Sequence, residues 1–236
     1  MTSNLQNRIN HAENFSRDLV HEIRNPLASL KSASEILSET DDNIQRKKLL
    51  NILAHDVERI ERLITDYSQM LKDEVALSKE KMKKISLKNI VKSVIDEFNN
   101  IQVGKKGIKI DFVEEKNSEE FLILGIENRI EQIIANLLDN SISFSQKNEK
   151  VIVKIFRDEN KKVILNVIDE GTGFKEKNTN KIFDRFYSNR PDKFGEHSGL
   201  GLNIVKNLVD LHGASINASN NLGQKGANVE IIFPKI

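Results

Sequence analysis

The chain has 236 residues, which at roughly 150 residues per domain allows one large domain or two modest ones. Its 36 Lys and Arg against 35 Asp and Glu give a formal net charge of +1, which excludes the strong basic field of a dedicated nucleic-acid-binding protein. Without cysteine, disulfides, a thiol nucleophile and a cysteine zinc site are excluded. No apolar run reaches about 18 residues and the N-terminus lacks an apolar signal core, so we expect no membrane contact by this segment.

Glycine and proline divide the chain into two regions. The first glycine is Gly104, and Pro26 is the one proline before it, so the first hundred residues are predicted to form long helices. Eight of the 11 glycines lie between Gly171 and Gly226, a pattern typical of turns or of backbone brought close to a ligand. We place the domains at 1–74 and 86–236, joined by a lysine-rich linker at 75–85.

The first region has apolar residues at alternating spacings of three and four, which predicts helices over 12–38 and 50–71. The stretch SETDDN between them is rich in turn and N-cap residues. The expected seams are Leu19, Ile23, Pro26, Leu30, Ala33 and Leu37, and then Leu50, Leu53, Val57, Ile60, Ile64, Tyr67 and Leu71. A two-helix hairpin leaves part of these stripes uncovered, so we expect a homodimer whose two hairpins form a four-helix bundle.

His21 is predicted to lie off the seam, on the exposed face that also carries Asn25. Glu22 follows it, and Pro26 interrupts the helix pattern at a cost of about 3 kcal/mol. A lone exposed histidine is most often a plain surface residue. That interpretation is applied to the other four histidines, which are His11, His55, His197 and His212.

The second region alternates strand and helix patterns, which favours an α/β layered domain. Helices are expected over 87–98, 126–144 and 199–212, and strands over 108–115, 121–124, 151–158, 161–169, 214–219 and 227–233. The sequence has no GxxxxGK[ST] phosphate loop.

Four motifs in this region carry chemistry-bearing residues. Asn136 and Asn140 share one helix face, and carboxamide oxygens are hard ligands suited to Mg2+. The segment 169–173, DEGTG, follows a strand and is either a simple turn or a site where backbone approaches a flat base. The segment 182–187 suggests a loop anchor, and the glycines of 198–202 open a helix, a position that favours phosphate.

These motifs, in this order, resemble those of a known family. HEIRNPL at 21–27 resembles the H-box of the sensor histidine kinases of two-component systems. The four later motifs resemble the N, G1, F and G2 boxes of the same family's ATP-binding domain, whose Bergerat (GHKL) fold is shared with Hsp90, MutL and DNA gyrase B. The resemblance runs from about Phe15 to Pro234. It implies a dimeric helical hairpin followed by an α/β sandwich ATP-binding domain.

The resemblance implies roles for three residues of the H-box. His21 would be phosphorylated at a ring nitrogen, which suits the nucleophilicity of a neutral imidazole near pH 7. Glu22 would accept the other ring proton and stabilise the cation. Asn25 matches the family position that orients water when such a kinase dephosphorylates its partner.

The resemblance also implies a nucleotide site. Asn136 and Asn140 would hold Mg2+ and phosphates, Asp169 would bind the adenine amino group, and Gly171 and Gly173 would make room for the base. The phosphates would be enclosed by the helix-opening residues Ser198, Gly199, Leu200 and Gly201. The polar segment from about 175 to 198 would be a mobile lid.

The chain departs from the family pattern at four positions. Ser141, Ser143 and Phe144 replace the usual alanine, basic residue and tyrosine, and Ala227 replaces a threonine. The missing basic group would be supplied by Arg190 of the lid or by Lys147, and Phe144 could still stack on adenine. The strings FYSNRP and HSGLGL resemble the ChvG/ExoS branch, which also tends to carry such an N-box.

The predicted function is ATP-dependent autophosphorylation of His21, followed by phosphotransfer to an aspartate of a response regulator and a reverse phosphatase activity. The alternative is a phosphatase-biased or pseudokinase scaffold, motivated by Ser143. Gyrase-like ATPases of this fold lack the H-box. With 20 residues before His21, the chain is either a cytoplasmic fragment of an inner-membrane sensor or a short kinase that takes signals through its N-terminal helix. The fragment is expected because members of the family usually carry sensors upstream. No nucleic-acid partner is expected.

Overall fold

A computed structural model of the chain describes residues 2–77, 80–101, 107–115, 120–176, 178–187 and 199–236. The chain divides into two compact units, of which the first ends at Val75 and the second begins at Ala76. None of the described helices is both long enough and apolar enough to cross a membrane.

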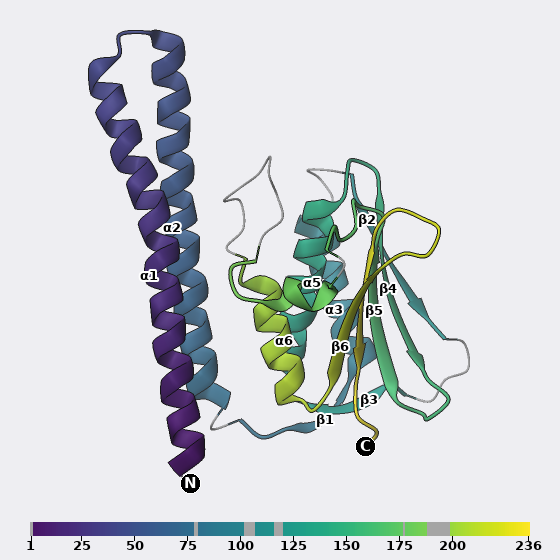
Figure 1. Cartoon of the computed structure of the whole chain (residues 1–236). Helices are drawn as coiled ribbons and strands as arrows, with labels where there is room; N and C mark the ends of the chain where they lie inside the picture. The colour runs from purple at the N-terminus through teal and green to yellow at the C-terminus, as the bar shows by residue number, and fades with distance from the viewer. Residues whose placement is uncertain (1, 78–79, 102–106, 116–119, 177, 188–198) are drawn as a thin grey trace. The chain divides into compact units, whose positions relative to one another are not determined.

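The first unit is a helical hairpin of α1 (Thr2–Glu39) and α2 (Asn43–Leu77), as the sequence predicts (Figure 1). The turn is closed by side chains on both sides. Asp42 Oδ1 accepts a hydrogen bond of 2.9 Å from the Ile44 amide, which caps the start of α2. Arg46 donates to the carbonyls of Leu37 and Thr40 at 3.2 and 2.9 Å, which satisfies the end of α1.

In the single hairpin, Pro26 and Ala33 of the predicted α1 seam are buried, whereas part of the predicted α2 seam is exposed, as expected for stripes that one hairpin leaves partly uncovered. Leu50, Val57 and Ile64 are 54%, 45% and 50% exposed. The side chains that α2 buries lie one residue earlier, at Leu49, Asp56 and Leu63. Alternating three- and four-residue spacing on α2 therefore combined two helix faces, one packed within the hairpin and one left open. Val20 and Leu27 of α1 are exposed as well.

The second unit is an α/β sandwich, the predicted fold class. Its five-stranded sheet has the order β2 (Lys109–Glu114), β4 (Lys150–Arg157), β5 (Val163–Asp169), β7 (Ala227–Ile232) and β6 (Ser215–Asn220). The β2–β4 pair is parallel and the other pairs are antiparallel. One face is covered by α3 (Leu87–Ile101), α5 (Glu127–Phe144) and α6 (Gly201–Leu211), as Figure 1 shows.

The core of the second unit lies between these helices and the sheet. Alternate residues of β4 and β5 are fully or almost fully buried, and so is one face of α5. The main contributors are Val151, Val153, Ile155, Leu165, Val167, Ile130, Ile133, Ile134 and Leu137. This packing fixes the C-terminal end of α5 relative to the end of β5, where the predicted site residues lie.

Two short elements were not predicted. β1 (Lys83–Ser86) pairs antiparallel with β3 (Leu122–Gly125), with Lys84 opposite Leu124, so strand begins inside the stretch predicted as linker. A 3-10 turn, η1 (Thr179–Phe183), lies in the predicted lid.

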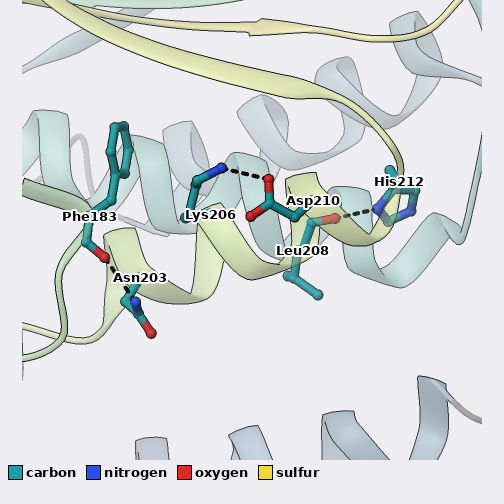
Figure 2. A network of polar contacts seen from close by, with 6 residues as sticks. All are labelled: Phe183, Asn203, Lys206, Leu208, Asp210 and His212. Carbon is teal, nitrogen blue, oxygen red and sulfur yellow. Dashed lines mark hydrogen bonds and ion pairs between the residues drawn. The ribbon is translucent and has the colours of Figure 1, made fainter. Parts of the chain in front are cut away.

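That 3-10 turn includes the first residues of the loop anchor predicted within the segment 175–198. Ile182 and Phe183 are buried, and the Phe183 carbonyl accepts a 2.8 Å hydrogen bond from Asn203 Nδ2 of α6 (Figure 2). The described part of the segment, up to residue 187, is therefore anchored on α6, in line with the loop anchor predicted for 182–187.

His212 corrects the sequence prediction, because it is a buried structural residue and not a surface histidine. Nδ1 lies 2.7 Å from the Leu208 carbonyl, and Nε2 accepts a 3.1 Å hydrogen bond from the Ile126 amide (Figure 2 shows the first contact). This pairing requires the neutral ring with its proton on Nδ1. Burial lowers the pKa of His212, with the Leu208 hydrogen bond opposing that shift. The ring joins the end of α6 to the start of α5.

We predict that His212→Ala destabilises the protein by about 2 kcal/mol, because the buried Ile126 amide loses its acceptor. Lys206→Ala removes only an exposed ion pair to Asp210 and should cost less than about 0.5 kcal/mol. Urea denaturation followed by circular dichroism measures both. Since the folded state binds the His212 proton less readily than the unfolded chain, the wild-type free energy of unfolding should also fall as pH drops below the ordinary histidine pKa of 6.5. Equal stability of the two variants would contradict this role.

Candidate functional site

The carboxylate of Asp169 lies at the centre of the candidate site, at the end of β5, and is 6% exposed. Its Oδ1 accepts hydrogen bonds from the amides of Gly171 at 2.9 Å and Ala227 at 3.1 Å, and the carboxylate also accepts one from the Ser141 hydroxyl. Burial raises the pKa of Asp169, while the three hydrogen bonds act in the opposite direction. The donors hold the carboxylate in one orientation.

Glycine is required at two places around this carboxylate. A Cβ at Gly171 would lie 2.7 Å from the carbonyl oxygen of Phe144, the last residue of α5. Gly226 has a φ of +108°, and a Cβ there would lie 1.8 Å from the Asp169 carbonyl oxygen. The backbone of Phe144 therefore lies close to Gly171, and the backbone of Gly226 lies close to Asp169. Neither approach leaves room for a Cβ on the glycine. Gly173 lies nearby, beside Asn220.

Helix α5 carries the predicted N-box residues, and its last turn, through Ser141 and Phe144, meets the end of β5. Asn136 and Asn140 lie one turn apart and are both partly buried. Among the described residues, Asn136 Nδ2 is a buried donor with no hydrogen-bond partner, and Ser143 Oγ is likewise without one. Unpaired buried polar groups of this kind are costly, and they are typical of sites completed by a ligand or water. Partly buried Phe144 ends the helix.

The start of α6 supplies the next part of the site. Gly199 has a φ of +73°, and a Cβ there would lie 2.8 Å from the backbone of Phe186. Leu200 is buried and precedes the helix without capping it by a side chain, while a Cβ at Gly201 would meet nothing within 4 Å. The N-cap residue of α6 therefore contributes no side-chain hydrogen bond to the first helical amides. The predicted residues Arg190 and Ser198 lie outside the described residues.

The predicted H-box lies on α1 of the hairpin. His21 and Asn25 are exposed, as the helical spacing predicts, and Pro26 is buried. Glu22 is partly buried and forms a 3.0 Å ion pair with Arg59 of α2. The carboxylate next to His21 is therefore held by a cation from the other helix, a contact that the sequence did not predict.

Sequence reasoning also missed the polar side chains that hold the site's loops. Ser141 was noted only as a departure from a family pattern, yet its hydroxyl binds Asp169. Asn220 and Asn221, at the end of β6, bind backbone groups of Phe174 and Asp169. The signal for the last two was available as two adjacent asparagines directly after a predicted strand.

Comparison with known proteins identifies two family domains in the chain. Residues 12–76 match the His Kinase A (phospho-acceptor) domain, and residues 125–236 match the histidine kinase-, DNA gyrase B-, and HSP90-like ATPase. The first match contains His21, and the second contains every residue predicted to bind nucleotide.

Individual relatives agree with this assignment. The sensor protein ChvG of Rhizobium meliloti is 36% identical over 232 residues, covering 96% of this chain and 40% of that protein. ChvG of Agrobacterium fabrum is 34% identical, covering 96% and 39%. The crystal structure of histidine kinase ThkA with response regulator TrrA matches with a TM-score of 0.68 at 26% identity, covering 98% of this chain and 64% of that chain. The chain spans less than half the length of the ChvG proteins.

The chain therefore belongs to the sensor histidine kinases of two-component systems. Within that family it is ChvG-like, as the strings FYSNRP and HSGLGL predict.

We predict that Gly171→Ala destabilises the protein by about 1–3 kcal/mol, because the new Cβ would collide with the backbone of Phe144. Gly201→Ala is the matched change, since it adds the same methyl group where nothing lies within 4 Å. It should leave stability unchanged or raise it by up to about 1 kcal/mol, the helix preference of alanine over glycine. Differential scanning calorimetry measures both variants, and a Gly171→Ala protein as stable as wild type would contradict the close approach of α5 to the β5 end.

Proposed function

We propose that the chain binds ATP in its second unit, phosphorylates His21 and passes the phosphoryl group to an aspartate of a response regulator. One observation carries the proposal: a single chain holds an exposed histidine in a phospho-acceptor domain and a buried, hydrogen-bonded Asp169 in an ATPase domain. Further support comes from ThkA, which is known in complex with a response regulator.

In the proposed site, Asp169 accepts a hydrogen bond from the adenine amino group. The carboxylate already accepts two backbone amides and the Ser141 hydroxyl, and its remaining lone pairs are proposed to accept the exocyclic amine. Gly171 and Gly173 leave room for the base, and Phe144 offers an aromatic face at the end of α5. The amides of Gly199, Leu200 and Gly201 are proposed to bind the phosphates at the start of α6, a contribution also proposed for Ser198 and Arg190, which lie outside the described residues.

Asn136 and Asn140 are proposed to hold Mg2+ together with the nucleotide phosphates. The residues present fit this role, because amide oxygens are hard ligands and the buried Asn136 Nδ2 lacks a protein partner among the described residues. A bound magnesium ion would neutralise charge on the phosphates. Asn140 lies one turn further along the same helix, toward Ser143 and Phe144.

The proposed reaction transfers one phosphoryl group. A ring nitrogen of His21 attacks the γ-phosphorus, the bond from that phosphorus to the β–γ bridging oxygen breaks, and ADP leaves. Glu22, held by Arg59 at 3.0 Å, contributes a fixed negative charge that favours the imidazolium form of the phosphorylated ring. Asn25 is proposed to orient the water that attacks the regulator's phosphoaspartate in the phosphatase direction.

The exposed apolar face of the hairpin supports a homodimer. Leu50, Val57 and Ile64 repeat every seven residues on α2, and Val20 and Leu27 do so on α1. Such repeats are typical of a helix face that packs against another helix. We propose that two hairpins cover these faces in a four-helix bundle. We also propose that the segment is the cytosolic part of an inner-membrane sensor, because its substrate ATP and its regulator partner are cytosolic.

We predict that His21→Gln abolishes labelling by γ-labelled ATP and retains ATP binding, because only the acceptor nitrogen is lost. The label on wild type should be acid-labile and base-stable. His55→Gln, a partly buried histidine on α2, is the matched control and should be labelled like wild type. Label that persists in His21→Gln would place the acceptor elsewhere. Wild type that binds ATP without any label would favour the phosphatase-biased scaffold, and Ser143 would then be the first residue to replace with lysine.

We predict that Asn140→Asp weakens ATP–Mg2+ binding about tenfold to a hundredfold, because a negative charge replaces an amide beside the phosphates. Titration calorimetry measures the dissociation constant. Light scattering should show the same dimer mass for variant and wild type, since Asn140 lies outside the hairpin. Unchanged affinity would remove Asn140 from the proposed site, and a monomeric wild type at micromolar concentration would overturn the dimer.

A further inference from the structure

Two consecutive asparagines at the end of β6 hold the loop that follows β5. Asn220 Oδ1 accepts a 2.6 Å hydrogen bond from the Phe174 amide, and its Nδ2 donates to the Phe174 carbonyl at 2.9 Å. Asn221 Nδ2 donates to the Asp169 carbonyl at 2.9 Å and to the Lys225 carbonyl at 3.0 Å. Three of these contacts bracket the segment 169–174, with one asparagine at each end, and the fourth holds Asn221 to the Lys225 carbonyl of its own turn.

Two further contacts hold the bracketed segment: Glu170 Oε2 accepts a 2.9 Å hydrogen bond from the Lys150 amide of β4, and Asp169 Oδ1 accepts one of 3.1 Å from the Ala227 amide of β7. In the described part of the chain, no backbone–backbone hydrogen bond of a turn or loop joins residues 170–174 to anything. The amide of Gly171 binds the carboxylate of Asp169, a contact within the segment. Residues 170–174 are therefore tied to their surroundings through side-chain contacts, and Asn220 and Asn221 provide those from the end of β6.

The close approach at Gly173 shows how tightly the segment follows these side chains. Its φ is +71°, and a Cβ there would lie 2.8 Å from Asn220 Oδ1 and 3.1 Å from the Gly226 carbonyl oxygen. On the other side, the Gly226 backbone fits beside the Asp169 carbonyl only because it lacks a Cβ. Asn220 and Asn221 therefore bind backbone groups in a region where Gly173 and Gly226 allow close packing of the main chain.

We infer that Asn220 and Asn221 form an amide clamp, defined by these two side chains, that positions the nucleotide-binding loop 169–174. They are positioning residues and touch no proposed ligand atom. Asn221 fixes the main chain of the residue whose carboxylate is proposed to bind adenine, and Asn220 fixes the segment beyond Gly173. A loop ordered in advance spares the nucleotide the entropy cost of ordering it. This inference rests on the proposed function.

The amide chemistry gives variants that separate the two contacts. Asn220→Asp keeps the acceptor for the Phe174 amide and loses the donor, whereas Asn220→Ala loses both. Asn221→Asp loses both donated bonds and sets a carboxylate against the Asp169 and Lys225 carbonyls, so it should be more harmful than Asn221→Ala. Asn217→Ala is the matched control, an exposed asparagine on the same strand.

The first measurement is titration calorimetry of the full chain with ATP, beside the thermal midpoint of each variant. We expect Asn220→Ala and Asn221→Ala to raise the ATP dissociation constant about tenfold, the loss expected for two net hydrogen bonds. Asn220→Asp should lie between wild type and Asn220→Ala. In autophosphorylation, KM for ATP should rise while kcat stays within about twofold. Unchanged dissociation constants in folded variants, or a fall in kcat alone, would overturn the clamp.

The second measurement needs no nucleotide. Amide hydrogen exchange of the free protein should be faster at Phe174 in Asn220→Ala, because that amide loses its acceptor, and unchanged in Asn217→Ala. Equal exchange in wild type and Asn220→Ala would overturn the clamp as a structural device. Wild type that fails to bind ATP would instead overturn the proposed function, and faster exchange at Phe174 would still show the clamp.

Discussion

A buried carboxylate is costly unless donors surround it, and in this chain the carboxylate of Asp169 draws its donors from three separate elements. The Gly171 amide comes from the loop after β5, the Ala227 amide from the start of β7, and the Ser141 hydroxyl from α5. The hydrogen bonds to the Asp169 carboxylate therefore determine where α5, β7 and the loop after β5 meet. The glycines at 171 and 226 are consequences of this arrangement, because each removes a Cβ that would separate the meeting segments.

The two units solve different packing problems. The second closes a core between one sheet face and three helices, and a neutral His212 links two of those helices at their ends. The hairpin buries one stripe of each helix and leaves another stripe of α2 open. Its chemistry-bearing face is polar, and Glu22 is tied to Arg59 across the two helices. The second unit therefore holds its candidate site on a packed core, and the hairpin leaves His21 exposed. These properties suit the proposed roles of the two units in binding ATP and in accepting its phosphoryl group.

The regular helices and strands could be predicted from the sequence because apolar residues recur at the spacing that places them on one buried face. β1 could not be predicted, since its first residues are exposed lysines and its pairing partner, β3, lies about forty residues further along the chain. The burial of Leu49 and Leu63 within the hairpin was not predicted, because each lies one residue before a predicted seam position, and the burial of His212 was not predicted because it depends on the distant Ile126 amide. The motifs supplied the candidate site residues, whereas the side chains that support them were found only through their contacts.

The open stripe of α2 has a consequence for how the protein responds to dilution. If a second hairpin covers Leu50, Val57 and Ile64, the free energy of burying them enters the stability of the fold through mass action. The helical unit would then unfold more readily as the protein is diluted, while the second unit, whose core is internal, would not. Two melting transitions with different concentration dependence are the expected signature, and cellular abundance would become a determinant of how much acceptor histidine is held in a folded helix.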